Sequence, residues 1–191
     1  MNEQIWWHLA RASGIVAWLA LTALVLWGIV LATDLFPGHR RPAWLLAAHR
    51  WLGALTVGFM GVHVAALVAD SFVPFGLADV LVPFASDWKP GAVALGVFAM
   101  WGVIAVEVSS LAKRRLSRRA WRAIHLTSYP TYWLAGLHGT FAGTDATSLL
   151  YVSTSIVTLG AVLFATLYRV LHTKRQLREP QTAPPEPVHS A

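Results

Sequence analysis

The 191-residue sequence contains no cysteine. A disulfide framework, a thiolate metal site, a cysteine-ligated iron–sulfur cluster and a cysteine nucleophile are therefore all excluded. Charge is also scarce, because Asp, Glu, Lys and Arg together make up 13% of the residues, about half of their share in soluble domains. Hydrophobic residues reach 56%. This composition excludes a disordered chain and a basic nucleic-acid-binding domain, so no nucleic-acid partner is expected.

Five apolar stretches are present instead, and each is long enough to cross a membrane. A bilayer core about 30 Å thick requires about 20 apolar residues in a helix. The only formally charged residues inside the five stretches are Arg50 and Glu107. So many apolar helices in a chain of this length leave no polar shell to cover them, and the sequence predicts an all-α membrane protein with the lipid bilayer as its surroundings. The predicted spans are 12–33, 42–69, 91–112, 123–144 and 146–168.

Lys and Arg are distributed unevenly among the loops between these spans. If the loop at 36–42 faces the cytoplasm, 13 of the 15 basic residues lie on the cytoplasmic side, and only Arg11 and Lys89 lie outside. Cytoplasmic loops of membrane proteins carry such an excess of basic residues. The N-terminus is therefore expected outside and the C-terminus in the cytoplasm.

The chain divides into three parts by composition. Residues 1–11 suit an interfacial segment, and residues 12–171 hold the transmembrane domain. Residues 172–191 form a cytoplasmic tail that is predicted to be disordered, because it ends in the Pro-rich sequence EPQTAPPEPVHSA.

Four of the eight histidines lie within the predicted spans, where ionisable side chains are rare and usually functional. His49 and His63 are 14 residues apart on the second span, and His125 and His138 are 13 apart on the fourth. These separations correspond to about 21 Å and about 20 Å along the helix axes. The second and fourth spans run parallel. His49 should therefore share a depth with His125 near the cytoplasmic face, and His63 should share a depth with His138 near the outer face.

Two imidazoles facing each other at one depth form an axial ligand pair for a haem iron. Two such layers would place two haems across the bilayer, between the second and fourth helices of the bundle. Ligation by two histidines leaves no open coordination position, which suits electron transfer. Arg50 and Arg122, close to the ligands of the inner layer, are predicted to pair with haem propionates. The basic candidates near the outer layer are Arg11, His8 and Lys89.

Helix geometry leaves the alignment of these rings open. On an ideal helix, 14 residues bring His63 to within about 40° of His49, whereas 13 residues place His138 about 140° from His125. Pro130 lies between the latter two and can kink the helix. Glycines near the histidines suit either the close approach of a porphyrin or ordinary helix packing; they are Gly53, Gly58, Gly61, Gly136 and Gly139.

Two other interpretations of the histidines stay open at this point. They are partners in interhelical hydrogen bonds, or they form a transition-metal transport site. A transport site favours clustered carboxylates or sulfur at one depth, and Glu107 is the only carboxylate within the predicted spans.

Short motifs accompany the histidines. They are RASGIVAW in the first span, HRWLG at His49, GVHVAAL at His63, LVPFASDWKP in the outer loop, and WRAIHLTSYPTYWLAGLHGTFAGTD around His125 and His138. By these motifs and the histidine spacing, residues 11–171 resemble the ferric reductase-like transmembrane domain superfamily. That superfamily includes NADPH oxidases, ferric reductases and the MsrQ/YedZ-type haem-binding membrane subunits of bacterial periplasmic methionine sulfoxide reductase systems.

The resemblance implies transmembrane electron transfer through b-type haems. It assigns the inner haem to His49 and His125, and the outer haem to His63 and His138. Members often have six spans, so either an edge helix is missing here or the N-terminal segment replaces it. The resemblance to the small bacterial subunits also places the chain in the bacterial inner membrane.

The sequence shows no Gly-rich dinucleotide fingerprint and no flavin and nicotinamide domain like that of the oxidases. Electrons are therefore expected from a separate donor, which is a cytoplasmic flavin reductase, with flavin in exchange, or a quinol. The expected acceptor is an outer-side oxidoreductase, such as a periplasmic methionine sulfoxide reductase, or ferric ion. An oxidoreductase subunit is thus favoured over a complete enzyme. The alternative functions are a membrane scaffold or assembly factor, and a haem or metal transporter.

The charge distribution makes the orientation testable. A reporter fused after Arg178 should be active only if it functions in the cytoplasm, because the basic loops stay on that side. The matched control is a fusion within the loop at 70–90, which should give the opposite result. Activity of a periplasmic reporter after Arg178 would reverse the orientation and exchange the inner and outer assignments.

Overall fold

The computed structural model describes residues 3–33, 42–71, 73–144 and 147–178. Within these ranges every regular element is helical and no strand occurs, so the all-helical prediction is confirmed. The elements are α1 (Glu3–Ala32), α2 (Ala43–Ala69), α3 (Leu77–Leu81), α4 (Pro90–Leu111), the 3₁₀ turn η1 (Lys113–Arg115), α5 (Arg118–Leu126), α6 (Ser128–Ala142) and α7 (Leu149–Arg178).

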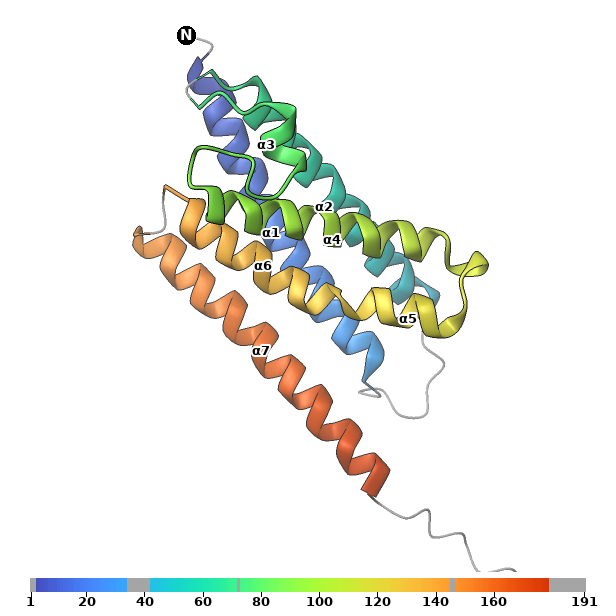
Figure 1. The fold of residues 1–191 in the computed structure, drawn as a ribbon. Helices are drawn as coiled ribbons and strands as arrows, with labels where there is room; N and C mark the ends of the chain where they lie inside the picture. Colours follow the sequence, from blue (N-terminus) through green and yellow to red (C-terminus); the bar gives the residue numbers. More distant parts are fainter. Residues whose placement is uncertain (1–2, 34–41, 72, 145–146, 179–191) are drawn as a thin grey trace, which may run out of the picture.

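The long helices associate as two neighbouring pairs. Helix α1 packs mainly against α2, and α4 packs mainly against α6, with α5 continuing alongside α4 (Figure 1). Helix α1 also touches α6 and α7, and so joins the two pairs. Helix α7 lies on the outside of the bundle, and its C-terminal half extends away from the other helices (Figure 1).

Among the described residues, four helices are long and apolar enough to cross a membrane, which is consistent with the membrane protein expected from the sequence. They cover Gln4–Ala32, Ala43–Ala69, Pro90–Leu111 and Leu149–Leu171. Between 6% and 22% of the most apolar window of each helix is buried inside the protein. The remaining apolar surface suggests a lipid environment, because a water-soluble monomer rarely exposes large apolar patches.

The fourth expected span, 123–144, is not one helix. Helix α5 ends at Leu126, Thr127 separates the two segments, and α6 begins at Ser128. Pro130 explains the position of the break, because a proline ring clashes with the carbonyl four residues earlier, here that of Leu126. The 15 residues of α6 extend about 22 Å, less than the thickness of a bilayer core.

Both ends of the transmembrane region differ from the boundaries expected from the sequence. Helix α1 begins at Glu3, so most of the expected interfacial segment 1–11 continues the first span. Helix α7 continues to Arg178, so residues 172–178 are helical although the tail 172–191 was expected to be disordered. Residues 179–191 lie outside the described residues.

Two apolar clusters hold the bundle together. One joins α1, α6 and α7 around Tyr132, which is fully buried. The other joins α4 to α3 and the loop before it, around Phe75 and Val80.

Hydroxyl groups inside the spans bond to backbone carbonyls of their own helix, as Thr56 does to Leu52 at 2.8 Å. No water is present in the bilayer core to satisfy such groups.

Helices α4 and α6 approach each other closely where Gly102 meets Thr131, since a Cβ at Gly102 would overlap the Thr131 side chain. Gly102→Ala should therefore destabilise the protein by about 1–3 kcal/mol through overpacking, measured as thermal unfolding in detergent. The control is Gly91→Ala in the same helix, because a Cβ there would meet no atom within 4 Å. Equal unfolding temperatures for the two variants would contradict this packing.

Candidate paired-histidine sites

The structure brings the four intramembrane histidines together as two pairs. The ring centroids of His49 and His125 are 6.2 Å apart, and those of His63 and His138 are 6.4 Å apart. In each pair one ring comes from α2 and the other from the broken rod formed by α5 and α6. These are the two combinations expected from shared depth.

The break at Thr127 lies between the two histidines of the α5–α6 rod. His125 lies in α5 and His138 in α6, so the two histidines are not on one ideal helix. The rotational offset of about 140° that an unbroken helix would give therefore does not apply. Each ring meets its partner on α2.

The separation of the rings fits a metal held between them. A metal bonded to opposed imidazole nitrogens requires ring centroids about 6.2 Å apart, because the metal–nitrogen bond is about 2.0 Å and the nitrogen lies about 1.1 Å from the ring centre. A zinc ion bound by a protein has three or four protein ligands, and no group of three or more His, Asp or Glu side chains occurs among the described residues. A haem iron takes only its axial ligands from the protein, so the pairs fit a haem better than a free ion.

Hydrogen bonds fix the His63–His138 pair. His63 Nδ1 lies 2.7 Å from the carbonyl oxygen of Ala10, and His138 Nδ1 lies 2.8 Å from that of Ala92. A carbonyl only accepts, so Nδ1 must carry the proton in both rings. Nε2 is then the nitrogen with a free lone pair, as in metal-binding histidines whose other nitrogen donates to a carbonyl.

The His49–His125 pair is held less tightly. His125 Nδ1 lies 3.4 Å from Ser110 Oγ, and the Ser110 hydroxyl donates to the carbonyl of Val106 at 2.7 Å. His49 Nδ1 is buried and has no hydrogen-bond partner within the described part of the chain. The Trp121 ring stacks on His125, with centroids 5.0 Å apart.

Each pair lines its own cavity. The apolar cavity, of about 700 Å³, contains His63 and His138 in its wall. The basic cavity, of about 1190 Å³, contains His49 and His125. Both have the size of a site for a cofactor. Leu21 and Val103 line both cavities and so lie between them.

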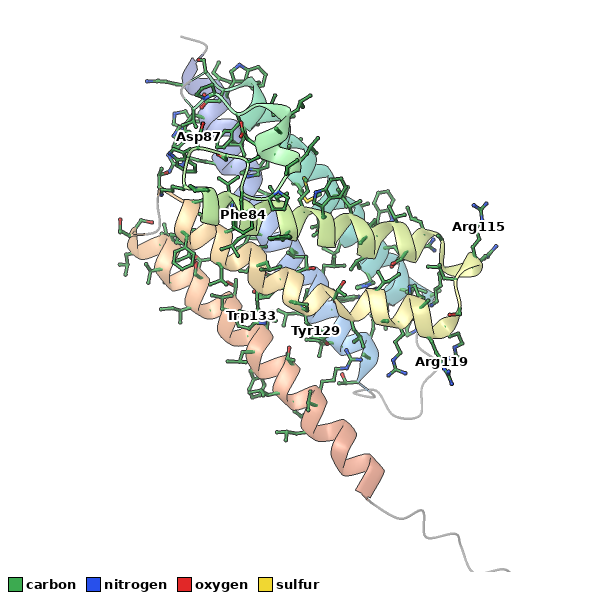
Figure 2. All side chains as sticks on the ribbon, in the orientation of Figure 1. Phe84, Asp87, Arg115, Arg119, Tyr129 and Trp133 are labelled. Carbon is green, nitrogen blue, oxygen red and sulfur yellow. The ribbon has the colours of Figure 1, made fainter. Side chains whose placement is uncertain are left out.

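Charge differs sharply between the two cavities. Arg50 and Arg122, predicted from the sequence to meet propionates, both line the basic cavity, and Glu107 is the carboxylate in its wall. Further basic residues complete this lining: Lys113, Arg114, Arg118, Arg119 and Arg169. Figure 2 shows Arg115 and Arg119 at one end of the bundle and Asp87 at the opposite end.

Of the three basic candidates for the other layer, Arg11 lines the apolar cavity. Lys89 instead donates to the carbonyl of Phe141 at 3.0 Å. His8 is exposed and is not part of the cavity wall. The apolar cavity therefore offers far less positive charge to an anionic ligand than the basic cavity does.

The glycines that touch the histidines are not those expected from the sequence. A Cβ at Gly58 or Gly61 would meet nothing within 4 Å, and a Cβ at Gly53 would meet Glu107. Gly136 lies against Trp18, and Gly139 against Tyr151.

Three other glycines lie directly against the imidazoles: Gly14 against His63, Gly28 against His49, and Gly96 against His138. Gly14 and Gly28 are 14 residues apart, the spacing of the two histidines on the helix beside them. This signal was present in the sequence. It acquires meaning only once α1 is known to pack on α2.

Comparisons with known proteins give no further guidance, since no family, no curated protein and no solved structure matches the chain.

The absence of cysteine makes the pairing testable without any cofactor. In a His63→Cys, His138→Cys variant, a short bifunctional thiol reagent should join α2 to α6, because the replaced rings face each other. Proteolysis between the two positions followed by electrophoresis would detect the link. The matched control is His63→Cys with His125→Cys, which should not be joined because the two residues belong to different pairs. Equal cross-linking of both variants would contradict the pairing.

Proposed function

We propose that the chain is a haem-binding membrane subunit of the ferric reductase-like type, which conducts electrons across the bilayer. One observation supports this proposal most strongly. Two histidine pairs, each with the ring separation of an axial pair on one metal, lie at opposite ends of the same two helical rods.

The proposal includes the arrangement in the membrane. The broken rod of α5 and α6 serves as a fifth span beside the four long helices, and no sixth span is required. The end that carries the arginines of α5 faces the cytoplasm of a bacterium, by the excess of positive charge. The basic cavity is then the inner site, and the apolar cavity is the outer site.

Haem b held by each pair would supply a one-electron carrier whose axial positions are both filled, which suits electron transfer rather than oxygen binding. The residues of the chain have three tasks around it. His63 and His138 present Nε2 because Nδ1 is occupied. The apolar lining excludes water, and Arg50 and Arg122 supply positive charge where propionates would lie.

The charge of the basic cavity also indicates how a donor would approach. Its cluster of Lys and Arg would attract an anionic donor through long-range electrostatic steering. We propose a cytoplasmic flavin reductase as the donor, with quinol as the other candidate. The acceptor on the outer side would be a partner reductase, such as a periplasmic methionine sulfoxide reductase, or ferric ion. The chain itself acts as one subunit of an oxidoreductase.

Haem content and its loss in variants test this function. The purified protein should contain two low-spin haems per chain in a reduced-minus-oxidised visible spectrum. His49→Ala and His125→Ala should each remove the same haem, and the double variant should add little, because partners in one site are not additive. His49→Ala with His63→Ala should remove both haems.

The control is His8→Ala, since His8 is exposed and lines neither cavity; it should keep both haems. Expression of each variant is followed by fluorescence-detected size exclusion, so that loss of haem is distinguished from loss of folding. A wild-type protein without haem would exclude the proposed function. If His49 behaved as the partner of His138, the two-layer arrangement would be wrong.

A further inference from the structure

We infer that Gly14 and Gly96 are positioning residues, which hold the imidazoles of His63 and His138 with Nε2 directed toward the apolar cavity. The binding of haem by these histidines, which gives the arrangement its purpose, rests on the proposed function. The positions of the two glycines beside the rings are observed contacts within the chain and do not depend on it.

The two glycines occupy equivalent places on different helices. On α1, the carbonyl of Ala10 bonds to His63 Nδ1, and Gly14 follows four residues later. On α4, the carbonyl of Ala92 bonds to His138 Nδ1, and Gly96 follows four residues later. Residues four apart lie on one face of a helix. In both cases, therefore, the ring crosses the glycine to reach the carbonyl one turn away.

A side chain at either glycine would block this path. A Cβ at Gly14 would lie 2.9 Å from His63 Nδ1 and 3.1 Å from Cε1. A Cβ at Gly96 would lie 2.6 Å from His138 Nδ1 and 2.7 Å from Cε1. In each case the three nearest atoms all belong to the histidine ring. An alanine would thus displace the ring from its carbonyl rather than push the helices apart.

The other histidine pair shows what happens where this arrangement is absent. Ser110 stands 14 residues after Gly96 on the same helix, and its hydroxyl lies between His125 Nδ1 and the carbonyl of Val106. Beside Gly28, His49 Nδ1 reaches no acceptor in the described residues. Direct bonds from both rings to backbone carbonyls are thus a property of the His63–His138 pair, where a glycine lies against each ring and the carbonyl four residues before that glycine accepts the bond.

A bond from Nδ1 to an acceptor fixes the tautomer and strengthens the ligand, and its loss typically lowers metal affinity about 10–100-fold. We expect Gly14→Ala and Gly96→Ala to lower the affinity for the outer haem within that range. Both should also raise the midpoint potential of that haem, because a weaker donor stabilises ferric iron less. The inner haem should be unchanged.

The experiment compares these variants with Gly58→Ala and Gly61→Ala, where a Cβ meets nothing within 4 Å. The first readout is the occupancy and the midpoint potential of each haem, from optical redox titration. The second is the tautomer of each histidine in haem-free full-length protein, from nitrogen NMR with labelled histidine. Gly14→Ala should change the Nδ1 signal of His63 alone, and Gly96→Ala that of His138 alone.

A double variant covers the case in which Gly96→Ala fails to fold. Because the three atoms nearest to the added Cβ all belong to the His138 ring, Gly96→Ala with His138→Ala should fold as well as His138→Ala. A double variant that still fails to fold would overturn the inference, as would equal behaviour of all four glycine variants. If the wild type bound no haem but the tautomers changed as expected, the positioning role would stand and the proposed function would fall.

Discussion

An imidazole placed inside a bilayer has to find a partner for its N–H within the protein, because the hydrocarbon core contains no water. Much of the structure follows from this requirement. Helices α1 and α4 lie beside α2 and the α5–α6 rod, and their backbones supply the acceptors for His63 and His138. A carbonyl already used within a helix has a second lone pair. The histidine ring can reach this second lone pair only where no side chain lies in between. A glycine meets this condition.

Because Nδ1 of His63 and of His138 is bonded to a neighbouring helix, the opposite nitrogen of each of these rings is left for the space between them. In this way the hydrogen bonds to the supporting helices orient the imidazoles of His63 and His138. The rings of each pair then stand at the distance of two ligands on one metal. Among the described residues, no group of three or more His, Asp or Glu side chains accompanies either pair.

The two cavities are alike in their histidines and different in their charge. The basic cavity is surrounded by Lys and Arg, whereas Arg11 is the charged residue in the wall of the apolar cavity. An anionic redox partner would therefore be attracted to one end of the protein only. Leu21 and Val103, whose side chains are aliphatic, are shared by the walls of the two cavities.

Counting residues was enough to predict an all-helical protein with long apolar helices, and to predict that His49 lies beside His125 and His63 beside His138. The rise per residue of a helix is nearly constant, so depth follows from sequence position. The direction in which a side chain points around the helix axis does not follow from sequence position, because it depends on packing between distant segments. The use of the Ala10 and Ala92 carbonyls as acceptors and the contacts of Gly14, Gly28 and Gly96 were decided only by the tertiary structure. Each of them depends on which face of one helix meets another, and no local pattern in the sequence determines that.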